Sequence, residues 1–239
     1  MKRRSWIRLG IAALAVVALL AALAAWQWAT WPDVARLAGE NPASTAFIDR
    51  WRGREQAAGR AGRPAWAPVA YARISDELKV AVVVAEDIDF FSHRGFAVAE
   101  IKKSISEALE EKELPRGAST ITQQLAKNLW LSPSRNPWRK VKEALLTRAL
   151  ERHLDKRRIL ELYLNVVELG PGVYGAEAAA RRYFGKSAAA LGRREAAELA
   201  ASLSMPSKWH PGVARRGYQR RVELILLRVE KSGWVRREL

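Results

Sequence analysis

The sequence predicts a mostly α-helical domain preceded by one N-terminal apolar segment. After Ser75 the apolar residues recur at helical spacing, as Val222, Ile225 and Val229 do near the C-terminus. Strand-like alternation is missing, and too few turn signals separate the apolar runs for an all-β protein. With 239 residues, the chain is long enough for one sizeable domain and an appendage.

Residues 1–31 predict a membrane anchor. Residues 1–8 carry four basic side chains, whereas residues 9–31 contain no charge and are mostly Ala, Leu and Val. About 20 apolar residues span the core of a bilayer, and tryptophans such as Trp26 and Trp31 favour its interface. Basic residues before the span place residues 1–8 in the cytoplasm and the rest outside the cytoplasmic membrane. A cleavable signal peptide is the alternative, because "ALAAW" offers small residues to a peptidase.

The charge balance narrows the class of partner. Lys and Arg number 41 against 25 Asp and Glu, which gives a net charge of +16. Such a surplus implies nucleic acid, lipid headgroups or a phosphorylated substrate, and the predicted anchor favours lipid phosphates or a lipid-linked substrate. The absence of cysteine excludes disulfides, thiol nucleophiles and cysteine-ligated metals.

Between the anchor and the domain, residues 32–68 are expected to form an irregular linker, because prolines and glycines interrupt them. The domain itself is expected at 69–239. Its first helix is predicted at 75–87, where Ser75 is a cap and acidic residues occupy the first turn. The β-branched middle of this stretch leaves a buried strand as the local alternative, although its length favours a helix.

Seven further helices are predicted in order along the chain. The second, at 97–114, ends at Pro115, and the third, at 119–131, is capped by Ser119 or Thr120. Proline in the first turn, or glycine or proline at the end, marks the limits of most of the others. These are predicted at 136–154, 155–170, 173–185, 191–206 and 218–233.

The stretch "VVVAEDIDFFSHRGF" at 82–96 is the first candidate for chemistry, because an apolar run meets Glu86 and Asp87. Partial burial raises the pKa of a carboxyl group and makes it a better general base near neutral pH. Phe90 and its neighbours offer an apolar wall, and His93 is able to bond a carboxylate. The alternative is a solvated helix end followed by core phenylalanines and a structural histidine.

The stretch "GASTITQQLAKN" at 117–128 is the second candidate. Thr120, Gln124 and Lys127 stand at i, i+4 and i+7, so they are expected to share one helix face. A hydroxyl, an amide and an ammonium group together suit sugar hydroxyls or a phosphate. An ordinary solvated face is the alternative.

The stretch "NPWRKVKEALL" at 136–146 is the third candidate. Arg139 and Glu143 are i, i+4 neighbours, and Lys140 and Lys142 add positive charge. The functional interpretation is a cation cluster for a diphosphate, with a carboxylate kept ionised among the cations. The alternative is a surface ion pair of little energetic value.

A fourth polar stretch, "ILELYLNVVELGPGVYG", places Asn165 and Glu168 near a helix end that glycines follow. Here we expect structural roles in capping, turn geometry and packing.

Taken together, these motifs resemble the bacterial peptidoglycan glycosyltransferase family, whose members polymerise lipid II into glycan strands. "EDIDFFSHRGF", "GASTITQQLAKN", "RKVKE" and "ILELYLNVVELG" occur in that family's order and spacing, and "ELAASLSMP" is similar to its last motif. The resemblance covers about residues 41–206. Because the chain ends at Leu239, without room for a transpeptidase domain, it resembles the monofunctional members.

The resemblance implies a two-lobed, distantly lysozyme-like helical domain beside the membrane and an inverting glycosyl transfer. It implies that Glu86 is the general base on the acceptor 4-hydroxyl and that Glu143 is a second catalytic carboxylate near the leaving diphosphate. Lys127 and Arg139 match cations that stabilise this diphosphate. Other positions that match substrate-binding or supporting residues are Asp87, Phe90, His93, Ser119, Thr120, Gln124, Asn128 and Lys140.

The resemblance also implies a location and partners. The protein is expected to be a single-pass protein of the cytoplasmic (inner) membrane, with its domain on the periplasmic side. Its expected partners are lipid II, the growing lipid-linked glycan chain and proteins of cell-wall synthesis or division, and not nucleic acid. No dedicated metal site is expected from the sequence, but a Mg²⁺ or Mn²⁺ ion at the diphosphate stays open, because some members use one.

Two other functions compete with this interpretation. A lysozyme or lytic transglycosylase also uses a glutamate in a helical lobe, but it needs no diphosphate site. The cations at Lys127, Arg139 and Lys140 therefore argue against it. A membrane-anchored scaffold of cell-wall assembly would keep the fold without needing Glu86.

Overall fold

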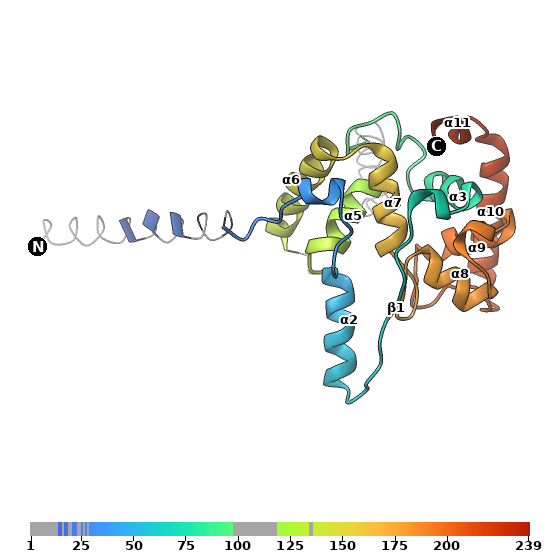
Figure 1. The fold of residues 1–239 in the computed structure, drawn as a ribbon, viewed down its shortest axis with the longest axis horizontal. Helices are drawn as coiled ribbons and strands as arrows, with labels where there is room; N and C mark the ends of the chain where they lie inside the picture. Colours follow the sequence, from blue (N-terminus) through green and yellow to red (C-terminus); the bar gives the residue numbers. More distant parts are fainter. Residues whose placement is uncertain are drawn as a thin grey trace, which may run out of the picture. The chain divides into compact units, whose positions relative to one another are not determined.

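The computed structural model describes residues 29–97, 119–133 and 136–239, together with residues 14, 15, 17, 18, 21, 22, 25 and 27 (Figure 1). The chain divides into two units, Met1–Asp33 and Val34–Leu239. In the first unit, the described residues from 14 to 29 are helical. No helix in the described part of the chain is both long and apolar enough to cross a bilayer. The predicted tail at 1–8 and most of the predicted anchor at 9–31 lie outside the described residues.

The second unit is mostly helical, which confirms the predicted class. Its described 3-10 turns are at Ala35–Ala38, Tyr71–Arg73 and Ala188–Ala190. Its described α-helices are α2 (Ala46–Ala57), α3 (Asp76–Glu86), α5 (Ile121–Trp130), α6 (Pro137–His153), α7 (Lys156–Val166), α8 (Ala176–Phe184), α9 (Arg193–Ser202), α10 (Arg216–Lys231) and α11 (Val235–Glu238). The helix predicted at 97–114 lies almost wholly outside the described residues.

Local signals in the sequence place the starts of α3 and α5. The Ser75 hydroxyl accepts a hydrogen bond from the backbone N–H of Leu78, which caps α3. Thr120, rather than Ser119, caps α5, and the Gln123 side chain bonds back to the Thr120 N–H to complete a capping box. Each cap needs only residues three positions apart, so the sequence predicts Ser75 and narrows the cap of α5 to Ser119 or Thr120.

The second unit also contains a small three-stranded sheet, which the sequence did not predict. Strand β3 (Val173–Tyr174) lies between β1 (Ala65–Trp66), which is parallel to it, and β2 (Glu168–Gly170), which is antiparallel. Strands of two or three residues are too short to leave a period-two pattern in a sequence. Residues 168–170 form β2, so the helix predicted to reach Gly170 ends at Val166.

The expectation of an irregular linker at 32–68 is also wrong, because this segment contains α2. Thr45 caps the helix by accepting a hydrogen bond from Ile48, and α2 packs against α5. Arg158 of α7 holds the preceding turn, since its guanidinium donates to the carbonyl oxygens of Leu37 at 2.8 Å and Glu40 at 2.7 Å. The prolines lie on either side of the helix, where they do not interrupt it.

Two sets of helices position the candidate site (Figure 1). Helix α3 packs against α9 and α10, whereas α5 packs against α6 and α7. Residues 78–84 of α3 are buried without a break, so the acidic residues that follow start at the edge of a core. The end of α3 and the start of α5 then meet through polar side chains.

Candidate active site

The carboxylate of Glu86 lies at the end of α3 and is largely buried, with 14% of its side chain exposed. Nε2 of Gln124, from α5, donates a hydrogen bond to Oε2 of Glu86 at 2.8 Å. Burial raises the pKa of Glu86, and the bond from Gln124 and the positive charges of Arg221 and Lys127 offset only part of this effect. A raised pKa suits a general base that works near neutral pH.

Tyr163 of α7 determines which way the Gln124 amide faces. Its hydroxyl donates a hydrogen bond to Oε1 of Gln124 at 2.9 Å, so the amide nitrogen is left to face Glu86. Tyr163 is wholly buried, and burial raises the pKa of its phenol well above the usual range, which keeps the hydroxyl protonated. Nothing in the sequence points to Tyr163, because it stands in a run of core residues.

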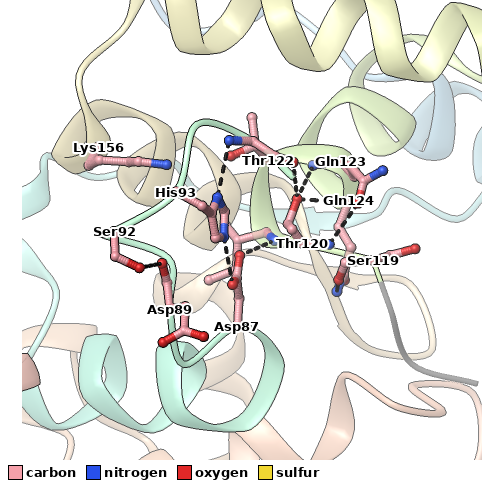
Figure 2. Close-up of polar contacts among 12 residues, drawn as sticks. Asp87, Asp89, Ser92, His93, Ser119, Thr120, Thr122, Gln123, Gln124 and Lys156 are labelled. Atoms are coloured by element: carbon pink, nitrogen blue, oxygen red, sulfur yellow. Dashed lines mark hydrogen bonds and ion pairs between the residues drawn. The ribbon is translucent and has the colours of Figure 1, made fainter. Parts of the chain in front are cut away.

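Asp87, the neighbour of Glu86, joins the end of α3 to the start of α5 (Figure 2). It is 2% exposed, and its Oδ2 accepts a hydrogen bond from the backbone N–H of Ile121 at 2.9 Å. Nε2 of His93 lies 2.9 Å from Oδ1. Because Nδ1 of His93 accepts a hydrogen bond from the Gly95 N–H at 3.1 Å, Nε2 is the ring nitrogen that carries hydrogen, and it donates a hydrogen bond to Asp87. These bonds set the spacing between Glu86 and Gln124.

Three further residues expected at the site, Thr120, Phe90 and Asn128, are buried around the contact between α3 and α5. The Thr120 hydroxyl donates to the carbonyl oxygen of Gly95 at 2.8 Å and caps α5 (Figure 2). Thr120 is only 1% exposed and does not join Gln124 and Lys127 in lining the pocket described below. Phe90 is fully buried against the ring of Phe91, and Asn128 is buried in α5.

A positively charged pocket lies beside this support, between α5 and α6. It has a volume of about 100 Å³. Most of the candidate residues of the second and third motifs come together in its wall, and the structure adds Gln123 to them. The lining residues are Ser119, Gln123, Gln124, Lys127, Arg139, Lys140 and Glu143.

The pocket holds more positive than negative charge. Glu143 is 3% exposed, accepts a hydrogen bond from Arg139 at 2.6 Å and is also paired with Lys140. Burial lowers the pKa of Lys127, although the negative charge of Glu143 opposes this effect. Three cations around one carboxylate in a partly dehydrated pocket favour the binding of an anion, which would in turn favour the charged form of Lys127.

The fourth motif has the structural role that the sequence predicts. Oδ1 of Asn165 accepts a hydrogen bond from the Val69 N–H at 2.9 Å, and Nδ2 donates to the Val69 carbonyl at 2.8 Å. This pair of bonds fastens the segment before α3 to α7. Glu168 lies in β2 and accepts a hydrogen bond from the Gly172 N–H at 3.3 Å.

Arg221 of α10 is a second residue near Glu86 that no sequence motif predicts. Its Nη2 donates a hydrogen bond to the Ala85 carbonyl oxygen at 3.0 Å and lies 3.8 Å from Oε1 of Glu86. In the sequence, this arginine stands among many basic residues and follows the last motif of the resemblance.

Comparisons with known proteins agree with the predicted family. The family model described as "Transglycosylase" matches residues 55–230. The chain is 46% identical over 228 residues to a biosynthetic peptidoglycan transglycosylase of Thiobacillus denitrificans, covering 93% of this chain and 95% of the relative. Proteins of the same description from Azoarcus sp. and Laribacter hongkongensis are 49% identical over 209 residues (85% of this chain, 87% of the relative) and 40% identical over 230 residues (94% and 96%). The span matched by the family model includes every residue that surrounds Glu86 and lines the pocket.

Proposed function

Because the chain belongs to the transglycosylase family and is a peptidoglycan glycosyltransferase of cell-wall synthesis, we propose that it polymerises lipid II with Glu86 as general base. The product is a β-1,4-linked glycan strand, and undecaprenyl diphosphate is released. One observation carries this proposal. Gln124 holds the Glu86 carboxylate and also lines the cationic pocket, so the proton acceptor and the anion site are adjacent.

The two sites divide the chemistry of an inverting transfer. Glu86 takes the proton of the acceptor 4-hydroxyl as its oxygen bonds to the anomeric carbon of the growing chain. The bond from that carbon to the lipid diphosphate breaks, and the diphosphate leaves with both bonding electrons. Lys127, Arg139 and Lys140 stabilise this leaving group, because its negative charge grows in the transition state.

Glu143 has a different part from Glu86. Arg139 and Lys140 occupy both oxygens of its carboxylate, which leaves it poorly placed to take a proton. We assign it to holding these two cations at the edge of the pocket, near the diphosphate. Asp87, Phe90, Thr120 and Asn128 are assigned to support, because they are buried. His93 is assigned to support through its bond to Asp87, and Ser119 to substrate contact.

The wider arrangement follows from the same proposal. The set formed by α3, α9 and α10 and the set formed by α5, α6 and α7 would be the two lobes of a lysozyme-like domain. Residues 9–31 would anchor the protein in the cytoplasmic (inner) membrane, with residues 1–8 in the cytoplasm. Residues 32–68 would then lead to a catalytic domain at 69–239 on the periplasmic side, where the protein meets its lipid-linked substrate.

The proposal extends to a divalent cation and to protein partners. A Mg²⁺ or Mn²⁺ ion would be held mainly by the phosphates of the substrate, because the described pocket offers one carboxylate, Glu143, which is already paired. Proteins of cell-wall synthesis or division are proposed as partners, and nucleic acid is not.

Lipid II polymerisation by the purified protein tests the proposal. Wild type is expected to produce glycan strands and to release undecaprenyl diphosphate, whereas Glu86→Gln is expected to do neither. Polymerisation by Glu86→Gln at the wild-type rate would remove the general-base role. Cleavage of finished glycan without polymerisation would favour a lysozyme or lytic transglycosylase activity.

A further inference from the structure

A cation from α10 lies beside Glu86, on the side of its carboxylate away from Gln124. Nη2 of Arg221 lies 3.8 Å from Oε1 of Glu86, while Gln124 bonds Oε2. The same Nη2 donates to the carbonyl oxygen of Ala85 at 3.0 Å. The carboxylate is therefore approached from both sides, by an amide of α5 and a guanidinium of α10.

The end of α3 is an unfavourable place for a negative charge. Glu86 is the last residue of the helix, and the carbonyl groups there form the negative pole of the helix dipole. Burial disfavours the charged carboxylate further. Ala85 has one of the four last carbonyl groups, which have no partner within the helix. Arg221 bonds this carbonyl and brings a positive charge to Glu86, so one side chain offsets both effects.

The hydrogen bond to the Ala85 carbonyl needs only a donor, so it does not by itself require an arginine at this position. Nε of Arg221 is buried and has no hydrogen-bond acceptor within the described part of the chain. A buried donor without an acceptor is destabilising, and a neutral side chain would avoid it. What the arginine adds is its charge next to Glu86.

We propose that Arg221 is a positioning residue, which holds the Glu86 carboxylate in place and in its charged form between turnovers. This inference rests on the proposed role of Glu86 as general base. In each cycle Glu86 takes a proton from the acceptor hydroxyl and releases it to solvent. The charge of Arg221 favours the release, which returns Glu86 to the carboxylate.

Arg221 is the more suitable of two cations for a test. Among the residues that the structure describes, the charged groups that act on Glu86 are Arg221 from α10, Lys127 from α5 and the adjacent Asp87. Arg221 has a larger effect on the pKa of Glu86 than Lys127. Tyr163, from α7, stays neutral. Lys127 lines the cationic pocket, but Arg221 does not, so its replacement leaves the proposed diphosphate site intact.

The experiment compares the pH dependence of kcat/KM for lipid II polymerisation in wild type, Arg221→Gln and Arg221→Lys. Loss of the charge raises the pKa of Glu86, so the acid limb of Arg221→Gln is expected to move up by about 1 pH unit. Its activity should return towards wild type at alkaline pH. Arg221→Lys keeps the charge, and its acid limb is expected near that of wild type. Arg220→Gln is the matched control, because Arg220 is the exposed neighbour on the same helix.

Two results would overturn the inference. One is an acid limb in Arg221→Gln that coincides with those of wild type and Arg220→Gln. The other is an equal loss of activity at every pH, with a lower Tm and no rescue by Arg221→Lys, which would make Arg221 structural. If Arg221→Gln does not fold, Arg221→Met replaces it, because an apolar side chain leaves no unpaired donor.

Glu86→Gln, measured in parallel, separates this inference from the proposed function. If Glu86→Gln polymerises as fast as wild type, the general-base role is wrong and Arg221 has no base to position. If Glu86→Gln is inactive and the acid limb of Arg221→Gln does not move, only the role of Arg221 is wrong.

Discussion

Gln124 donates a hydrogen bond to Glu86 across 2.8 Å, although the two residues stand 38 positions apart in the chain. Because Gln124 also lines the cationic pocket, a change in its orientation would affect the proposed base and the proposed diphosphate site together. The residues that hold Gln124 and Glu86 in place are therefore expected to influence turnover without touching the substrate.

Tyr163→Phe tests the first of these supports. Without the phenol, Oε1 of Gln124 loses its donor and the amide is free to turn away from Glu86. We expect kcat/KM to fall by up to about tenfold, the factor that corresponds to roughly 1.4 kcal/mol. Tyr218→Phe is the matched control, because the buried Tyr218 donates one hydrogen bond, at 3.0 Å to the Glu198 carbonyl, away from the site. Equal rates in the two variants would contradict the role of Tyr163.

Asp87→Asn tests the joint between α3 and α5. The carboxylate accepts two hydrogen bonds, from Ile121 and His93, whereas an amide presents a donor to one of them. We expect the free energy of unfolding to fall by about 1–3 kcal/mol, measured by thermal unfolding. We also expect polymerisation to slow, measured by lipid II turnover. Asp89→Asn is the control, because Asp89 is exposed. A fully active and equally stable Asp87→Asn protein would show that the joint is dispensable.

Glu86→Gln is expected to stabilise the protein at neutral pH while it abolishes activity. The pKa of Glu86 is raised above 4.5 in the folded state, so the ionised form is less favourable in the folded than in the unfolded chain. This cost is complete above the folded pKa and disappears below the unfolded pKa. Each unit of pKa difference corresponds to about 1.4 kcal/mol.

The measurement is Tm of wild type and Glu86→Gln from pH 8 down to the acid range. The stabilisation should be largest at pH 8 and vanish as the pH falls through the raised pKa of Glu86. Glu143→Gln is the contrasting variant, since it leaves Arg139 and Lys140 without their buried partner and should destabilise at neutral pH. If Glu86→Gln destabilises the protein at pH 8, ionisation of Glu86 does not disfavour the folded state.

Lys127→Met tests the charge of the pocket. Methionine approximately fills the volume of lysine, so the variant removes a half-buried cation without opening a cavity. We expect polymerisation to fall by about 10²–10³-fold, as when one stabilising donor is lost from a transition state, while Tm is unchanged or higher. Lys142→Met is the control, because Lys142 does not line the pocket. A parallel loss of Tm and activity in Lys127→Met would make Lys127 structural.

The parts of the site that the sequence predicts well are those formed within one helix turn. Ser75 and Thr120 cap helices through residues three positions away, and Arg139, Lys140 and Glu143 meet because i+3 and i+4 residues share a helix face. The sheet and α2 could not be predicted in this way. The strands are too short to show a period, and the prolines that flank α2 resemble the punctuation of a loop.

The sequence by itself determined the helical class, the Ser75 cap, the family and the cation cluster around Glu143, because local spacing and motif order encode all of them. The tertiary structure decided that the Thr120 hydroxyl closes inward, that Tyr163 orients Gln124, and that Arg221 reaches back over 136 residues to the end of α3. The physical reason is that burial and contacts between distant helices depend on how the helices pack. The sequence does not show which distant residue a single tyrosine in a run of core residues, or a single arginine among many, will contact.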